Sequence, residues 1–171
     1  MKITRNAAIQ MFRTLGTMAL GHLSEATLEA TMDNFNAFRK AAEDFDKLRE
    51  ELNKRLYQGV DEKRKEDFFN LVGKFEAEKD ATKKEEYNKL MQDSYAELYL
   101  IYEKHLAVLA SLANKEIEVE ITKVDKDDFL RGVMRGNKDN NAFLVEYVFG
   151  FMFKDAEKKE DDFSELDELL K

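Results

Sequence analysis

The group of residues that most resembles a metal site in the sequence consists of carboxylates. These are Asp125, Asp127 and Asp128, with Glu120 shortly before them. Carboxylate oxygens are the ligands that Mg²⁺ prefers, and such a group would suit a magnesium-dependent enzyme. The alternative is the acidic first turn of a helix, which the helix dipole stabilises. We favour this alternative because Asp125 has the position of an N-cap residue. The sequence therefore predicts no metal site and no cofactor.

The two histidines offer little to a catalytic site. His22 and His105 lie far apart, and neither belongs to a His-x-x-x-His pair, the spacing that a catalytic zinc ion commonly uses. His105 follows Leu98 and Tyr102 in the apolar register of its helix, so it is either a ligand or base, or a core histidine bonded to a tyrosine or a carbonyl. We favour the core histidine. His22 lies beside an expected helix end and is assigned no role.

Motifs of other enzyme classes are incomplete. Gly73 and Lys74 lack the upstream glycine and the following serine or threonine of a phosphate-binding loop. Residues 137–141 resemble the start of a calcium loop, but Ala142 and Val148 stand where that loop needs glycine and glutamate. The chain contains no cysteine, which excludes a thiolate nucleophile and a cysteine zinc site. We therefore expect a protein that is not an enzyme.

Two segments are candidates for binding a partner. Residues 143–153 hold four phenylalanines and would form either a core helix or an interface anchor. Residues 155–171 hold eight acidic and three basic residues and would form either a solvated tail or a helix that folds into a partner's groove. The predicted partner-binding residues are Phe143, Tyr147, Phe151, Phe153, Phe163, Leu166, Leu169 and Leu170.

Charge and hydropathy narrow the classes of partner. The 171 residues carry a formal net charge of -8, which argues against binding to the phosphate backbone of nucleic acids. Residues 155–171 contribute -5 of this charge, so residues 1–154 carry only -3. Residues 143–153 are too short for a membrane span of about 20 residues, and the N-terminus lacks the apolar core of a secretory signal. We expect a soluble protein inside the cell.

Helical periodicity dominates the first half of the chain. Apolar residues at intervals of three or four predict a helix over residues 6–21 and a long helix over residues 25–57. Gly21 and Gly59 follow the two patterns as helix stops. Ser24 has the position of the N-cap of the long helix.

A lapse in the apolar pattern predicts a joint between the next two helices. Thr82 and Glu85 have the spacing of a capping box after this lapse. We expect helices over residues 61–78 and 83–113, with a single long helix as the alternative. The apolar stripe of 83–113 is the natural antiparallel partner of the helix over 25–57.

The period then changes to that of a strand. Residues 116–122 alternate strictly, with Ile117, Val119 and Ile121 on one face and glutamates on the other. Because a lone strand leaves its backbone unpaired, we expect it to pair with residues 1–4.

The fold class that follows is mainly α. We expect a helical bundle with a long antiparallel helix pair and a two-stranded sheet of residues 1–4 with 116–122. A short helix is expected from Asp125 to about Met134, and a last helix over residues 142–153. The predicted domains are a single helical domain over residues 1–153 and an acidic tail over 154–171.

The order of these elements resembles a family of small, uncharacterised bacteriophage and prophage proteins. The matching segments are an N-terminal MKIT, a long helix FRKAAEDFDKLREELNKRLY and a strand entering a helix, LANKEIEVEITKVDKDDF. The resemblance covers about residues 1–150. It implies a phage-encoded accessory protein, and it assigns no active-site residue.

Three functions of different classes follow. The first is a non-catalytic, phage-type accessory protein that acts through protein–protein contacts in virion assembly or host takeover, in the bacterial cytoplasm or on the virion, with self-association as one form of contact. The second is an acidic inhibitor that mimics nucleic acid against a host defence nuclease. The third is the carboxylate-based magnesium enzyme. We favour the first.

Overall fold

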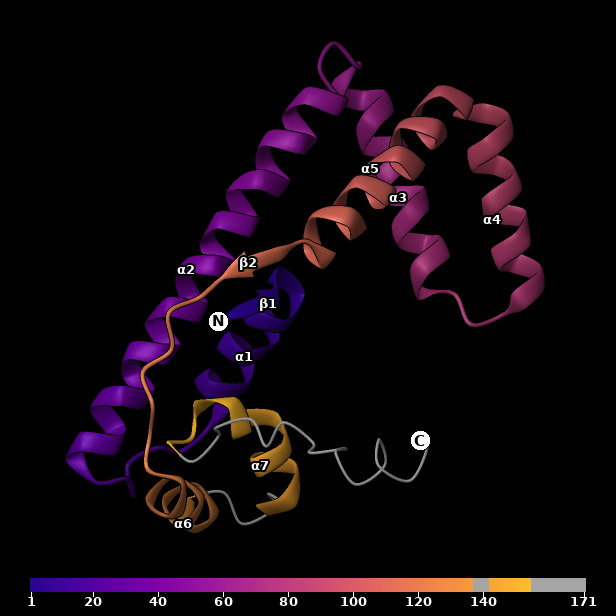
Figure 1. The fold of residues 1–171 in the computed structure, drawn as a ribbon. Helices are drawn as coiled ribbons and strands as arrows, with labels where there is room; N and C mark the ends of the chain where they lie inside the picture. Colours follow the sequence, from indigo (N-terminus) through magenta and orange to yellow (C-terminus); the bar gives the residue numbers. More distant parts are fainter. Residues whose placement is uncertain (137–141, 155–171) are drawn as a thin grey trace, which may run out of the picture. The chain divides into compact units, whose positions relative to one another are not determined.

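A computed structural model describes residues 1–136 and 142–154 of the chain (Figure 1). This part is mainly helical with a small two-stranded antiparallel sheet, as the sequence predicts. Its elements, in order, are β1 (Lys2–Thr4), α1 (Arg5–Thr17), α2 (Glu25–Leu56), α3 (Glu62–Ala77), α4 (Ala81–Ser94), α5 (Ala96–Asn114), β2 (Glu116–Glu118), α6 (Lys126–Gly136), α7 (Ala142–Phe149) and a 3₁₀ turn η1 (Gly150–Met152). No helix in the described ranges is long and apolar enough to cross a membrane.

The described residues form two compact units, each with its own hydrophobic cluster. The terminal unit comprises Met1–Ile3, Ala7–Ala41 and the described residues after Glu116, whereas the middle unit comprises Thr4–Asn6 and Ala42–Glu116. The sequence predicted a single helical domain over residues 1–153. No linker marks the division, because α2 is continuous and contributes its two halves to different units.

The long helix α2 has nearly the predicted bounds. Ser24 precedes it, and its carbonyl accepts the first helical hydrogen bond from the amide of Leu28. Gly59 follows the helix with a φ of 81°, a left-handed conformation that glycine adopts without steric cost. Asp61 then caps α3, since its carboxylate accepts a hydrogen bond from the amide of Arg64 at 2.9 Å. Local capping signals thus define both ends of this connection.

The middle unit departs from the prediction in two places. The joint before α4 is present, but Asp80 rather than Thr82 is the N-cap, and it accepts a hydrogen bond from the amide of Lys83 at 3.0 Å. The helix predicted over 83–113 is divided at Tyr95, whose φ and ψ of -132° and 34° lie outside the helical region. The division allows residues of both α4 and α5, including Met91, to join one cluster around Phe68.

The predicted strand pairing is confirmed, although β2 is shorter than expected. The N-terminal amino group donates to the carbonyl of Val119 at 2.7 Å, and the amide of Val119 donates back to Met1 at 2.8 Å. From Glu120 to Lys123 the chain runs beside α2 and pairs with no strand of the described residues. There, the buried amide of Asn34 accepts from the amide of Thr122 and donates to its carbonyl, both at 2.8 Å. The side chain of Asn34 therefore supplies the hydrogen bonds that a neighbouring strand would otherwise make with the backbone of Thr122.

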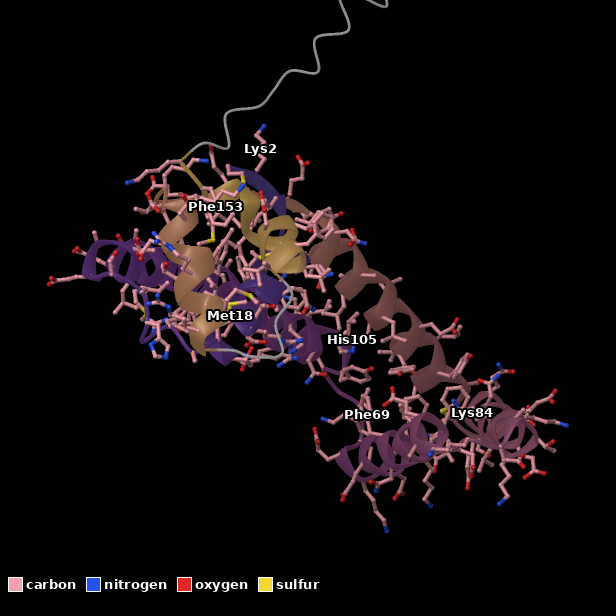
Figure 2. The ribbon with its side chains drawn as sticks, turned by 90° about the horizontal axis from the view of Figure 1, so that it is seen from below. Lys2, Met18, Phe69, Lys84, His105 and Phe153 are labelled. Atoms are coloured by element: carbon pink, nitrogen blue, oxygen red, sulfur yellow. The ribbon has the colours of Figure 1, made fainter. Side chains whose placement is uncertain are left out.

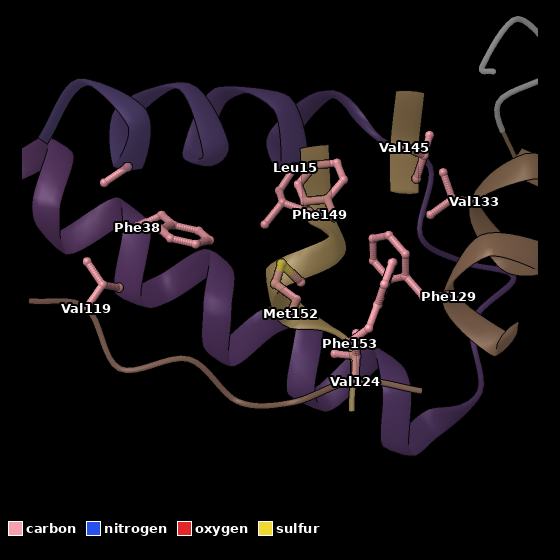
Figure 3. Packing of buried hydrophobic residues seen from close by; sticks show 11 residues of the cluster. Leu15, Phe38, Val119, Val124, Phe129, Val133, Val145, Phe149, Met152 and Phe153 are labelled. Atoms are coloured by element: carbon pink, nitrogen blue, oxygen red, sulfur yellow. The ribbon is translucent and has the colours of Figure 1, made fainter. Parts of the chain in front are cut away.

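The core of the terminal unit is formed by residues distant in the sequence. Phe38 of α2, Phe129 of α6 and Phe149 of α7 are fully buried together (Figure 3). The rings of Phe129 and Phe149 lie 5.7 Å apart, as do those of Phe129 and Phe153. Because aromatic side chains bury large areas, this cluster fixes α6 and α7 on α2.

Two glycines let α6 pack directly on backbone. A Cβ atom at Gly132 would lie 3.0 Å from the carbonyl oxygen of His22, and one at Gly136 would lie 2.6 Å from that of Ala19. Contacts this short leave no room for a side chain. The segment against α6 is the turn after α1, which ends at Thr17, earlier than the predicted Gly21.

Candidate interaction surface

The helix α7 is held on the terminal unit along one side. Val145 and Phe149 are buried, and after η1 the chain forms a parallel bridge between Phe153 and Val124. The amide of Lys154 donates to the carbonyl of Val124 at 3.1 Å. An ion pair joins Glu146 of α7 to Lys126 of α6. The helix is therefore fixed at its C-terminal end and along its inner side.

The other side of α7 exposes three large apolar residues. The exposed fractions are 72% for Phe143, 57% for Leu144 and 81% for Tyr147. Residues at i, i+1 and i+4 share one face of a helix, so these side chains form one patch. We call Phe143, Leu144 and Tyr147 the α7 face. An exposed cluster of this kind is typical of an interaction site.

The predicted partner-binding residues fall into four groups. Phe143 and Tyr147 lie on the α7 face, while Phe151 is half-buried, with its ring 6.2 Å from that of Phe38. Phe153 is 3% exposed and belongs to the core. The remaining four lie outside the described residues: Phe163, Leu166, Leu169 and Leu170. Burial on the inner side of α7 matches the alternative of a core helix, whereas the alternative of an interface anchor stays a prediction for its exposed side.

Sequence reasoning missed Leu144. Apolar residues surround α7 in the sequence, so periodicity alone does not separate its inner from its outer side. The usable signal is Glu146, because a charged residue next to Val145 marks the border of the buried side. Leu144 then falls on the outer side with Phe143 and Tyr147.

The carboxylates near position 125 have structural partners. Asp125 accepts a hydrogen bond from the amide of Asp128 at 2.9 Å, as an N-cap does. Asp128 accepts from both the amide and the hydroxyl of Ser24, at 3.0 and 2.5 Å. Hydrogen bonds from Ser24 and Thr27 lower the pKa of Asp128. No group of three or more potential metal-ligating residues occurs within the described residues.

His105 is half-buried, and its ring packs against Tyr57 of the hydrophobic cluster in the middle unit (Figure 2). Its ring lies edge-on to that of Tyr57 at 5.7 Å. Neither His105 Nε2 nor the Tyr57 hydroxyl, both buried, has a hydrogen-bond partner among the described residues, so the predicted bond to a tyrosine is not made by these two atoms. Burial lowers the pKa of His105. Burial, together with the nearby Tyr102, raises the pKa of Tyr57 to about 12.

A hollow beside the turn between α2 and α3 is lined mostly by charged residues that pair with each other. Arg55 and Glu51 form an ion pair at 2.6 Å, and Lys65 and Glu62 form one at 2.7 Å. Neighbouring opposite charges on a surface neutralise one another and contribute little energy. The lining therefore offers no convergent group of the kind that catalysis requires.

No protein-family model, curated protein or solved structure matches this chain. The resemblance to bacteriophage proteins accordingly stays a prediction. The α7 face is the feature of the described residues that most resembles a functional site.

Proposed function

We propose that this chain is a non-catalytic protein that acts by binding a protein partner, with the α7 face as the apolar anchor of the contact. The observation that carries the proposal is the exposure of Phe143, Leu144 and Tyr147 on a helix whose other side is fixed in the core. Exposing such residues to water is unfavourable by about 25 cal/mol per Å². A partner that covers them recovers this free energy.

The chemistry of the face favours a protein over other macromolecules. Aromatic and aliphatic side chains are the usual energetic centre of protein interfaces, and a polar rim surrounds them. The ion pair of Glu146 with Lys126 lies beside the face and supplies one such rim element. Nucleic acids would instead require a basic surface, whereas the chain carries a net charge of -8.

The roles of the candidate catalytic residues support a non-enzymatic function. Asp125 and Asp128 hold the start of α6 and its contact with Ser24, and His105 packs against Tyr57. Structural contacts thus account for the positions of these three side chains. The resemblance of the sequence to bacteriophage proteins supports a virion or host protein as the partner.

The proposal is tested by affinity capture with the full chain. Immobilised wild-type protein is compared with the double variant L144D/Y147D in phage and host lysates, and captured proteins are identified by mass spectrometry. Leu100→Asp is the matched control, since Leu100 is 67% exposed on α5 in the middle unit. We expect a partner that wild type and L100D retain and L144D/Y147D loses, both in lysate and with the partner purified. Equal retention by all three proteins, or none by any, would reject the proposal.

A further inference from the structure

We propose that two copies of this chain associate through the exposed side of α5, with the two α5 helices parallel and related by a two-fold axis. This self-association uses no residue of the α7 face, so it is independent of the proposed function. Three properties of α5 support it: its composition, the residues on its exposed side and the placement of two charges there.

The composition of α5 does not match its burial. Only three of its nineteen residues carry a full charge, namely Glu97, Glu103 and Lys104. A helix that is largely apolar on every side is normally buried, yet Leu98 is the only buried residue among the nineteen that the structure describes in α5. Leu100 is 67% exposed. A surface of this kind is typical of a contact with another molecule.

The exposed side of α5 contains one continuous stripe. Successive helical residues lie about 100° apart, so exposed residues at i, i+4, i+11 and i+15 fall within about 60° of each other. These residues are Ala96, Leu100, Ala107 and Ser111, and we call them the α5 seam. In a parallel pair each Leu100 would meet its own copy, as leucines do in a coiled coil, and the smaller residues would let the helices approach closely.

Two charged residues flank the α5 seam symmetrically. Glu103 lies about 50° to one side of the centre of the seam, and Lys104 lies about 50° to the other. Both residues are exposed. Neither forms an ion pair with any residue in the described part of the chain. The two opposite charges are therefore available to a second molecule on either side of Leu100.

The placement of these charges makes the face complementary to itself in one orientation. In a parallel pair, each flank of one helix meets the opposite flank of the other at the same height. Glu103 of each copy then faces Lys104 of the other, so two ion pairs border the seam. In an antiparallel pair centred on the seam, each flank would meet itself and like charges would repel. A second copy in the parallel orientation thus supplies both a matching leucine and the opposite charges.

Analytical ultracentrifugation of the full chain over a range of concentrations tests the association. We expect the mass to rise from that of one chain to that of two. Leu100→Asp should raise the dissociation constant about tenfold or more, because a carboxylate would lie in the centre of the contact. Leu106→Asp is the matched control, since Leu106 is 48% exposed on the same helix but lies about 120° from Leu100. The mass of a single chain at every concentration, or equal effects of the two substitutions, would overturn the proposal.

A charge exchange tests the pairing of Glu103 with Lys104. E103K and K104E each place like charges opposite one another, so each should weaken the dimer several-fold at low salt, where screening is weak. The double variant E103K/K104E has the same net charge as the wild type and restores both ion pairs with the charges exchanged. Its dissociation constant should return to that of the wild type. A double variant as weak as either single variant would contradict this pairing.

The absence of cysteine from the chain allows an independent test of the orientation. Ala96→Cys and Ala107→Cys, made separately, each introduce one thiol in the α5 seam, and both variants are oxidised where the wild type is dimeric. A parallel pair places each thiol opposite its own copy, so both variants should form disulfide-linked dimers. In the antiparallel pair the two copies of residue 96 would be about 22 Å apart along the helices, beyond the reach of a disulfide. Failure of Ala96→Cys to cross-link would therefore overturn the parallel arrangement.

The two proposals fail separately. The α7 face belongs to the terminal unit, whereas α5 belongs to the middle unit. We expect L100D to lose the dimer and to retain the partner in affinity capture, and L144D/Y147D to lose the partner and to retain the dimer. A monomeric wild type would overturn the self-association alone, and failure to capture a partner would reject the proposed function alone.

Discussion

The two units of this protein are stabilised in different ways. The terminal unit joins segments distant in the sequence, through the sheet of β1 with β2, the amide of Asn34 with Thr122 and the bridge of Val124 with Phe153. The middle unit instead consists largely of consecutive helices, in which Phe68 of α3 packs against Tyr95 and Tyr102. Non-local contacts specify one unit, whereas short connections and caps specify the other.

The two units also differ in whether their buried polar side chains have hydrogen-bond partners. In the terminal unit the fully buried Asn34 has partners for both ends of its amide. In the middle unit the Tyr57 hydroxyl and His105 Nε2 are buried without a hydrogen bond from any described residue. An unpaired buried polar group lowers the free energy of unfolding by about 1–3 kcal/mol. These two groups therefore destabilise the middle unit, whereas the paired Asn34 does not destabilise the terminal unit in this way. Substitutions in the two units should therefore have different, and in places opposite, effects.

The largest difference is expected from one substitution type made in both units. Gly136→Ala places a methyl group 2.6 Å from the backbone oxygen of Ala19, and overpacking against backbone costs about 1–3 kcal/mol. Gly73→Ala, in α3, meets no atom within 4 Å and should stabilise by about 0.5–1 kcal/mol, because alanine favours helix. Urea unfolding measures both. Equal effects at the two positions would contradict the packing of α6 on the turn after α1.

The second prediction compares a long-range polar contact with a local cap. Asn34→Ala removes two hydrogen bonds and leaves the backbone of Thr122 unpaired, which should cost about 2 kcal/mol. Asp61→Ala removes the N-cap of α3 in the middle unit and should cost about 1 kcal/mol. Urea unfolding of the two variants tests the order. A greater loss for Asp61→Ala would show that the connection after β2 does not depend on Asn34.

The same contrast explains what the sequence could predict. The start of α2 after Ser24, the cap at Asp61 and the pairing of residues 1–4 with the strand beginning at 116 were predictable, because each depends on a local signal or on strict alternation. The break at Tyr95 was not. Apolar residues recur at helical spacing through Tyr95, so periodicity continues where the backbone does not.

The exposed α7 face was predictable in part for a related reason. The composition of residues 143–153 identified the segment, and Phe143 and Tyr147 are exposed on it. Which phenylalanines serve the core was not readable, since Phe149 and Phe153 are as apolar as Phe143. Their burial is decided by Phe129, which lies on another helix. Which phenylalanines are buried therefore depends on tertiary packing, which the sequence of a single segment does not encode.

A smaller effect, specific to the middle unit, concerns His105. Burial lowers its pKa in the folded state below the ordinary value of 6.5, so below about pH 6.5 the unfolded chain binds a proton that the folded chain resists. The free energy of unfolding should therefore fall as the pH is lowered from 7 toward 5. His105→Phe removes both this proton and the unpaired nitrogen. Urea midpoints between pH 7 and 5 should then fall less steeply in the variant than in the wild type; parallel curves would show that His105 is protonated while folded.

The smallest effect separates a specific contact from general charge at the start of α6. Asp128→Asn weakens the bonds from Ser24 and should cost about 0.5–1 kcal/mol at pH 7, since hydrogen bonds to a charged acceptor are stronger. Asp127→Asn is the matched control, because Asp127 lies in the same helical turn and makes the same change in charge. The folded-state pKa of Asp128 is lowered, so its contribution is complete above the unfolded value of 3.8 and is lost as the pH falls through the folded one. The difference between the two variants in urea unfolding should accordingly vanish in acid. A difference that persists there would assign the effect to packing rather than to the charge of Asp128.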